Sequence, residues 1–145
     1  ICLDQVSDPQ NAAAISRTAS FYGVDCIVVS GKGSFGRSPS FYRIASGAAE
    51  FVKIISVSNM SRFVNRLQEF DCFCIGLSEH SATDEIELEK ISNKSVAIVL
   101  GNEERGLSNA VSRVLKQTFC LSSQGVIKSL NVSVASAISM EKFFK

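Results

Sequence analysis

The chain lacks the features that mark several classes of protein. No stretch reaches the roughly 18 consecutive apolar residues of a membrane-spanning helix, and no segment resembles a secretory signal peptide. An excess of charge of one sign is also absent, because 15 basic and 14 acidic residues give a formal net charge of +1. A nucleic acid would therefore have to bind a local basic patch. The single histidine, His80, lies in a polar segment, and we assign it no catalytic role.

The five cysteines form no pattern typical of a metal site. The sequence has neither a Cys-x-x-Cys pair nor a Cys/His group with the spacing of zinc ligands. An odd number of dispersed cysteines is typical of buried, reduced thiols in a cytoplasmic protein. We therefore expect a cytoplasmic chain without bound metal, whose thiols are Cys2, Cys26, Cys72, Cys74 and Cys120.

The order of apolar and polar segments predicts an α/β fold. With 145 residues, 46% of them hydrophobic, the chain can bury one core, so one domain is expected. Strands are predicted at 1–6, 25–30, 53–58, 72–77, 95–100 and 118–121, and helices at 11–22, 41–51, 59–69, 107–115 and 129–144. Segment 79–93 is polar and is expected to be irregular or weakly helical. This alternation predicts an open parallel sheet with helices on both faces.

A polar loop follows the buried strand that ends at Leu100. In open α/β sheets, ligands bind at the carboxyl ends of the strands. The loop, Gly101-Asn-Glu-Glu-Arg-Gly-Leu-Ser108, has two glycines with the spacing of a phosphate-binding loop. However, Leu107 stands where the phosphate-binding lysine is needed, and Glu103 and Glu104 would repel phosphates. The loop is therefore a candidate ligand site, but not for a nucleoside triphosphate.

A second glycine-rich segment, Gly31-Lys-Gly-Ser-Phe-Gly36, has the spacing of a dinucleotide fingerprint. Ser38-Pro39 follows it instead of an immediate helix, and the next strand supplies no acid for a ribose. A flexible loop is the better interpretation. Basic and aromatic residues alternate here, so RNA contact is predicted for Lys32, Arg37 and Arg43, with Phe35, Phe41 and Tyr42 among them.

Three segments resemble the signature motifs of the SpoU/TrmH family of RNA ribose 2'-O-methyltransferases, in the knotted SPOUT superfamily. They are Asp8-Pro-Gln-Asn-Ala-Ala-Ala-Ile-Ser-Arg17-Thr-Ala, Gly101-Asn-Glu-Glu-Arg-Gly-Leu107 and Ser129-Leu-Asn-Val-Ser133, in the family's order. The run Ala45-Ser-Gly-Ala-Ala-Glu50 resembles the branch that modifies guanosine in large-subunit ribosomal RNA.

The resemblance implies a fold and an assembly that the residue pattern alone does not indicate. It implies a C-terminal trefoil knot, in which residues 118–145 thread through the loop around 101–107, and a homodimer formed through the knotted face. Many members carry a separate N-terminal RNA-binding domain. Because the sequence begins at Ile1, directly on a strand and without Met, we expect residues 1–145 to be a catalytic domain from a longer protein.

The resemblance also implies the reaction, which is methyl transfer from S-adenosylmethionine to a ribose 2'-hydroxyl, with ribosomal-RNA guanosine as the first expectation. The acidic loop suits an uncharged adenine and a cationic sulfonium, and no metal is required. Catalytic roles pass to Arg17, Asn11, Glu103, Ser129 and Asn131, and donor binding to Leu77, Gly101, Asn102, Gly106, Leu121, Ser123 and Leu130. Alternatives are a tRNA substrate, or an RNA-binding module that kept the fold without the activity.

Arg17 is an awkward general base, because a guanidinium stays protonated. We expect it instead to hold a phosphate and orient the 2'-hydroxyl. The chain departs from the family pattern at Ala13, where glycine is usual, and at Lys128. It also has Leu121-Ser-Ser123 where Ile-Pro-Met is usual, which predicts a looser donor loop. The retained motif residues still favour an active enzyme.

Overall fold

Six parallel strands form one sheet at the centre of the molecule. The computed structural model describes residues 1–36, 39–79, 91 and 93–144. The strands are β1 (Cys2–Leu3), β2 (Cys26–Ser30), β3 (Lys53–Val57), β4 (Phe73–Leu77), β5 (Val96–Leu100) and β6 (Gln117–Phe119). Their order across the sheet is β3-β2-β1-β5-β4-β6, and every neighbouring pair is parallel. The predicted α/β fold with a parallel sheet is confirmed.

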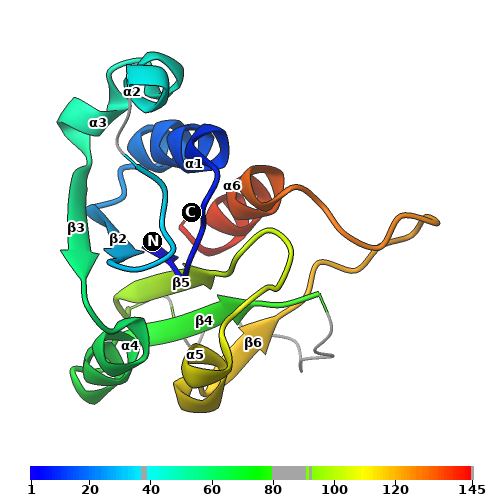
Figure 1. Cartoon of the computed structure of the whole chain (residues 1–145). Coiled ribbons are helices and arrows are strands. Elements are labelled where there is room, and N and C mark those ends of the chain that lie inside the picture. Colours follow the sequence, from blue (N-terminus) through cyan, green and yellow to red (C-terminus); the bar gives the residue numbers. More distant parts are fainter. Residues whose placement is uncertain (37–38, 80–90, 92, 145) are drawn as a thin grey trace.

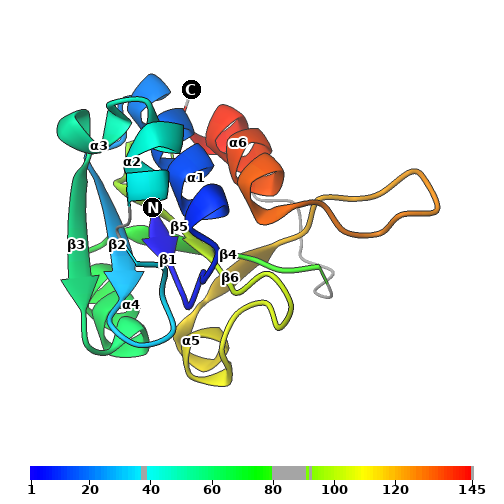
Figure 2. The same ribbon diagram turned by 45° about the horizontal axis from the view of Figure 1, so that its top comes forward.

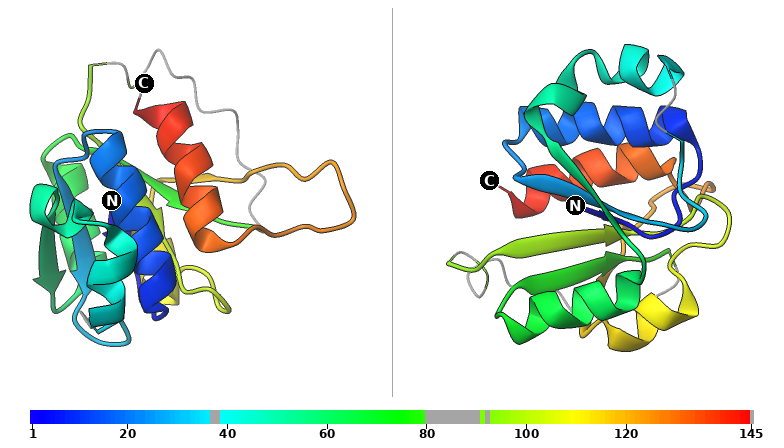
Figure 3. Two further views of the ribbon diagram at one scale, coloured as in Figure 1. Left: turned by 90° about the horizontal axis from the view of Figure 1, so that it is seen from above. Right: turned by 60° about the vertical axis from the view of Figure 1, so that its left-hand side comes forward.

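Helices cover both faces of this sheet (Figure 1 and Figure 3, right). One side carries α1 (Pro9–Phe21), α2 (Pro39–Ala45), α3 (Ala48–Phe51) and α6 (Val132–Phe143), and the other carries α4 (Met60–Glu69) and α5 (Asn109–Val114). Successive strand residues point to opposite faces, so Leu3 joins the core beneath α1 and Cys2 the core beneath α4. None of the described helices is long and apolar enough to cross a membrane.

The helix predicted at 11–22 begins two residues earlier, at Pro9, and Asp8 is its N-cap. The Asp8 carboxylate accepts a hydrogen bond from the Gln10 N–H at 2.9 Å, and Pro9 occupies the first turn. The helix ends before Gly23, whose φ of +67° suits glycine. These local signals place the N-terminus of α1 beside the end of β1.

The helix predicted at 41–51 was wrong as a single element. It is two helices, α2 and α3, separated by Ser46 and Gly47, whose φ angles of 49° and 79° are left-handed. A left-handed residue cannot continue a right-handed helix, so the chain turns there.

The last helix begins three residues later than predicted. Asn131 is its N-cap, because its side-chain oxygen accepts the Ser133 N–H at 2.8 Å, and α6 starts at Val132. Ser129 and Leu130 therefore belong to the connection from β6, residues 120–131. This segment projects away from the body of the molecule (orange in Figure 2 and Figure 3, left). Of the segment predicted as irregular, residues 80–90 and 92 lie outside the described residues.

Candidate functional site

A cavity of about 980 Å³ lies at the carboxyl ends of the central strands. Its walls come from the ends of β4 and β5, the loop 101–108, the connecting segment 120–131 and the start of α6, with Asn11 contributed by α1. Parallel strands bring their carboxyl ends to one edge of the sheet, which is where open α/β folds bind ligands. All three motif segments meet here.

The loop 101–108 is a tight turn held by its own backbone. Asn102 and Gly106 exchange two backbone hydrogen bonds, each of 2.9 Å. The Asn102 side-chain oxygen accepts the N–H groups of Glu104 at 3.0 Å and Arg105 at 3.2 Å. A Cβ atom on Gly101 would overlap the backbone of Gly106 and Leu107. Glycine at 101 is therefore required by the turn itself.

The same loop is fastened to the chain that follows β1. The Asn102 amide donates to the Gln5 carbonyl at 2.9 Å. The Ser108 N–H donates to the buried Asp4 carboxylate at 2.8 Å. These bonds fix one wall of the cavity, because they join residues about a hundred positions apart.

Glu103 lies across the N-terminus of α1. Its carboxylate accepts the backbone N–H groups of Ser7 at 3.3 Å and Asp8 at 3.1 Å, and the Ser7 hydroxyl at 3.3 Å. Partial burial raises the pKa of this carboxyl, but hydrogen bonds to the backbone N–H groups of Glu103 itself, Asp8 and Ser7 and to the Asn11 side chain outweigh it. The net pKa lies below its ordinary value, so Glu103 is ionised at neutral pH. A negative charge at a helix N-terminus is stabilising.

Asn11 connects the three motifs through one side chain. Its amide nitrogen donates to the Glu103 carboxylate at 3.3 Å, and its amide oxygen accepts from the Asn131 side chain at 2.9 Å. Asn11 is 8% exposed, so these bonds are largely shielded from water. The first, second and third motifs are thus linked as the chain Glu103–Asn11–Asn131.

The structure brings together the predicted donor-binding residues and most of the predicted catalytic residues. Every predicted donor-binding residue lines the cavity, namely Leu77, Gly101, Asn102, Gly106, Leu121, Ser123 and Leu130. Four of the predicted catalytic residues line it too, namely Asn11, Glu103, Ser129 and Asn131.

Arg17 is the exception. It is exposed on α1 and does not line the cavity. Six residues along an α-helix correspond to about 120° of rotation around the axis, so Arg17 and Asn11 point in different directions. Within a single chain, Arg17 therefore does not face the cavity that Asn11 lines.

The predicted RNA-contact segment is only partly available. Lys32 and Arg43 are exposed and lie outside the cavity lining, whereas Arg37 is outside the described residues. Phe35 and Phe41 are buried and stacked on each other, with ring centroids 5.0 Å apart. The rings of Phe35 and Phe41 belong to the core beside α1, so they do not add to the surface offered by Lys32 and Arg43. Tyr42 remains 49% exposed.

Sequence reasoning missed residues that hold or line the site without belonging to a motif. Asp4 and Ser7 hold the loop 101–108 in place, and the lining also includes Thr118, Ile127, Val132 and Ile138. Asp4 could have been singled out from the sequence, because it is an acidic residue directly after an apolar strand. The lining residues carry no local signal, because their neighbours are distant in the sequence.

The lining combines an apolar wall with an excess of negative charge. Leucine, isoleucine and valine side chains supply the apolar surface, and Glu79, Glu103 and Glu104 supply carboxylates. Arg105 and Lys128 are the basic residues among the described lining. This composition fits a ligand with an apolar ring system and a positive charge.

Comparisons with known proteins identify the family of this chain. The family model for the SpoU rRNA methylase family matches residues 1–141. An uncharacterized tRNA/rRNA methyltransferase of Borreliella burgdorferi is 33% identical over 138 residues, covering 95% of this chain and 60% of that protein. The chain thus spans about 60% of the length of this curated relative.

Solved structures share the fold. An AdoMet-bound rRNA methyltransferase from Sinorhizobium meliloti superposes with a TM-score of 0.81 at 26% identity, covering 94% of this chain and 52% of that chain. The SpoU methyltransferase AviRb from Streptomyces viridochromogenes, in complex with the cofactor AdoMet, gives 0.86 at 21% identity. That match covers 99% of this chain and 55% of AviRb, and at this identity it concerns the fold alone. Because the family match spans nearly the whole sequence and its three motifs meet at one cavity, this chain belongs to the SpoU rRNA methylase family.

Proposed function

We propose that this chain is the catalytic domain of an S-adenosylmethionine-dependent RNA ribose 2'-O-methyltransferase. One observation carries the proposal, which is that Glu103, Asn11 and Asn131, from three separate motifs, form a single hydrogen-bond chain on the wall of one cavity. The fold alone does not require the three side chains to contact one another. Their contact is explained if all three residues help to bind the same ligand in this cavity.

The cavity residues fit the proposed methyl donor. S-adenosylmethionine supplies an electrophilic methyl group carried on a sulfonium cation. Leu77, Leu121 and Leu130 offer apolar surface to an adenine ring, and the neighbouring carboxylates favour a cation. The similar structures from Sinorhizobium meliloti and Streptomyces viridochromogenes contain AdoMet, which supports the same ligand class here.

The protein's own contribution to the reaction is mainly positioning. Glu103 accepts hydrogen bonds from Ser7, Asp8 and Asn11, and its pKa is lowered, so it is a weak proton acceptor. We assign it the task of holding Asn11 and the donor loop in place. Ser129, which lines the cavity, is available to bind the acceptor ribose, and Arg17 is available on α1 to bind an RNA phosphate.

We further propose a homodimer that places Arg17 of one chain near the cavity of the other. The exposed surface of α6 carries Val134 at 48% and Ile138 at 43% exposure, and Phe21 at the end of α1 is 83% exposed. A second copy covering this surface would bury apolar side chains. It would also explain why Arg17, the arginine of the first motif, lies outside the cavity of its own chain.

The proposed trefoil knot is supported by the path of the last third of the chain. After β6 at the edge of the sheet, segment 120–131 passes the same cavity as the loop 101–108, and α6 then packs against α1 and β5. A chain that threads the 101–108 loop would have this order of neighbours. A further domain that binds RNA, outside residues 1–145, belongs to the same proposal.

Ribosomal RNA is the proposed substrate, with guanosine as the nucleotide. The run Ala45–Glu50, which carries the resemblance to that branch, spans the turn between α2 and α3. The methyltransferase from Sinorhizobium meliloti acts on rRNA, whereas the Borreliella protein is described as a tRNA/rRNA enzyme, so tRNA is the alternative.

Calorimetric titration with S-adenosylhomocysteine tests donor binding, with ATP and NAD as control ligands. We expect saturable binding of S-adenosylhomocysteine alone. Leu130→Arg should abolish it because Leu130 lines the cavity, whereas Val126→Arg should not, because Val126 lies in the same segment but outside the lining. A folded protein that binds no S-adenosylhomocysteine would contradict the proposal and favour an RNA-binding module.

Transfer of labelled methyl groups to total RNA tests the acceptor. Labelled ribosomal RNA is the expected product, and Arg17→Ala should reduce the rate without changing donor affinity. Full activity in Arg17→Ala would contradict the role proposed for that residue.

A further inference from the structure

The side of the sheet that α4 and α5 cover has a local excess of positive charge. Segments 58–70 and 107–117, which contain these two helices, hold four of the chain's 15 basic residues and one of its 14 acidic residues. All four basic residues are exposed, and we call them the basic face: Arg62, Arg66, Arg113 and Lys116. The net charge of the whole chain, +1, does not show this local excess.

The packing of α4 against α5 brings these residues to one side of the molecule. The two helices lie side by side (Figure 1). The Gln68 side chain joins them, because it donates to the Val114 carbonyl at 2.8 Å and accepts the Lys116 N–H at 3.3 Å. Arg62 and Arg66 are four residues apart on α4, so they project from the same face of that helix.

The cations of the basic face are not neutralised by neighbouring carboxylates. None of them forms an ion pair with a carboxylate of the described residues. Glu69, the one acidic residue of the two segments, accepts a hydrogen bond from the Asn65 amide at 2.9 Å. Exposed cations without acidic partners attract an anionic ligand.

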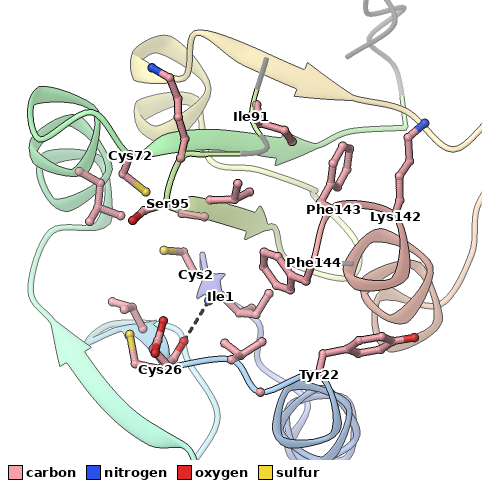
Figure 4. A pocket seen from close by; sticks show the side chains of 18 of the residues that line it. Ile1, Cys2, Tyr22, Cys26, Cys72, Ile91, Ser95, Lys142, Phe143 and Phe144 are labelled. Carbon is pink, nitrogen blue, oxygen red and sulfur yellow. Dashed lines mark hydrogen bonds between the residues drawn. The ribbon is translucent and has the colours of Figure 1, made fainter. Parts of the chain in front are cut away.

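The charges at another hollow of the molecule are balanced instead. A second cavity, of about 1010 Å³, lies at the amino ends of the strands, where Figure 4 shows Lys142 beside Phe143. Two acidic and two basic residues are among its lining, namely Asp25, Glu141, Lys94 and Lys142. The excess of positive charge is therefore a property of the α4–α5 side and not of the whole surface.

The basic face adjoins the candidate site. Both helices begin at the edge of the sheet where the first cavity lies, because α4 follows the carboxyl end of β3 and α5 follows the loop after β5. Ser112 of α5 lines that cavity, and Arg113 is the next residue. The proposed dimer uses α1 and α6 on the other side of the sheet, so it leaves the basic face open. An RNA whose ribose enters the cavity can therefore continue across α5 and α4.

We propose that the basic face binds backbone phosphates of the RNA that flanks the methylated nucleotide. This inference rests on the proposed RNA methyltransferase function. Three of the four residues are arginines, whose guanidinium groups bind phosphate through two parallel hydrogen bonds. Phosphate contacts hold and orient a nucleic acid without reading its sequence. The basic face also supplies the local basic patch that a nearly neutral chain needs to bind nucleic acid.

Fluorescence anisotropy with a labelled single-stranded RNA of about 20 nucleotides and mixed sequence tests this binding. Arg62→Gln/Arg66→Gln and Arg113→Gln/Lys116→Gln each remove two positive charges. Each double variant should weaken RNA binding by about tenfold or more at roughly 0.1 M salt. Each should also reduce the slope of log affinity against log salt concentration by about 1.4, because one phosphate contact contributes about 0.7 for a single strand.

The matched control is Lys53→Gln/Lys142→Gln, which removes two positive charges from exposed residues outside the basic face. This variant should keep the wild-type salt slope. An equal loss of RNA affinity in the control would show that net charge governs binding, and it would overturn the proposal. Unchanged RNA binding in both basic-face variants would overturn it as well.

Methylation kinetics separate this surface from the proposed reaction. With ribosomal RNA as the acceptor, the basic-face variants should raise the KM for RNA by about tenfold. They should leave kcat and the affinity for S-adenosylhomocysteine unchanged, because none of the four residues lines the cavity. Active variants with a wild-type KM would overturn the role of the basic face alone. A chain that binds no S-adenosylhomocysteine, but loses RNA binding in these variants, would support the basic face and contradict the proposed function.

Discussion

At the scale of single residues, Asn11 is the position on which the candidate site depends most. It is buried and bonds to a residue of each other motif. Asn11→Ala leaves the Asn131 amide and the Glu103 carboxylate without this partner, at a cost of about 1–3 kcal/mol in the free energy of unfolding. Affinity for S-adenosylhomocysteine should fall as well. Urea unfolding and calorimetry measure the two effects.

The matched control for Asn11 is Asn65→Ala. Asn65 makes one exposed side-chain hydrogen bond, to Glu69 at 2.9 Å, and lies on α4, away from the cavity. Its replacement should change stability by no more than about 0.5 kcal/mol and leave ligand affinity unchanged. Equal effects at Asn11 and Asn65 would show that the motif residue has no special role.

Glu103 gives a prediction about pH. Its pKa is lower in the folded chain than in the unfolded chain, because hydrogen bonds from backbone N–H groups and Asn11 outweigh partial burial. Its stabilising contribution is therefore complete above the ordinary glutamate pKa of about 4.3 and is lost as the pH falls through the lower, folded pKa. The stability difference between wild type and Glu103→Gln should be constant from pH 6 to 8 and shrink under acid. A difference that grows under acid would contradict the assignment.

The site residues were assigned through the resemblance of three motifs to a known family, and the structure supplies a local reason for some of them. A Cβ atom on Gly101 would overlap the turn, Gly106 has a left-handed φ of 68°, and Asp8-Pro9 starts α1. The partners of Glu103 were not predictable, since Ser7 and Asp8 lie 96 and 95 positions away and no local pattern encodes that contact. Arg17 points to solvent because it lies about 120° around the axis of α1 from Asn11. The motif gives only the spacing of these residues in the sequence, not the directions of their side chains.

At the scale of elements, two helix caps with the same chemistry should differ in whether their loss affects ligand binding as well as stability. Asn59 caps α4 and Asn131 caps α6 with the same chemistry, because each side-chain oxygen accepts a backbone N–H. Loss of the cap should cost about 1 kcal/mol at either position. Asn131→Ala should cost more than Asn59→Ala in total, because it also removes the hydrogen bond to the buried Asn11 side chain. Only Asn131→Ala should also weaken S-adenosylhomocysteine binding, because Asn131 alone touches Asn11 and lines the cavity. Thermal unfolding and titration of both variants check this, and weakened binding in Asn59→Ala would contradict it.

Strands β2 to β5 were predicted to within a residue at each end, because short apolar runs between polar segments leave few alternatives. The strand predicted at 1–6 was too long, because only Cys2 and Leu3 pair with neighbouring strands. The helix boundaries were less certain. Asn131 could continue a helix or cap one, and the choice depends on Asn11, which packs beside it only in the folded chain. The break at Ser46-Gly47 depends on left-handed φ angles that a serine seldom adopts. Sequence periodicity gave no sign of that break.

At the scale of the whole molecule, the proposed dimer makes its own prediction. Val134→Asp places a charge on the exposed apolar surface of α6 and should convert the dimer to a monomer in light scattering. Phe70→Ser, which changes a 76% exposed side chain at the end of α4, should leave the dimer intact. A wild-type chain that is monomeric at all concentrations would contradict the proposal.

The sheet order was beyond the reach of sequence analysis. Alternating strands and helices predict a parallel sheet, but not that β1 pairs with β5 or that β6 lies beside β4. Those pairings depend on which strands share buried faces, and all six strands are similarly apolar or short.

The pairing of β1 with β5 also bears on how the chain is made. Cys2 and Leu3 of β1 pair with Val99 and Leu100 of β5. Almost a hundred further residues must therefore be synthesised after β1 before β5, its second neighbour, exists. At roughly 5–20 residues per second, a ribosome needs about 5–20 s to synthesise them. During that interval the edge of β1 that later pairs with β5 has no partner strand. Until β5 is synthesised, this unpaired edge is the position at which the strands of two nascent chains would pair with each other.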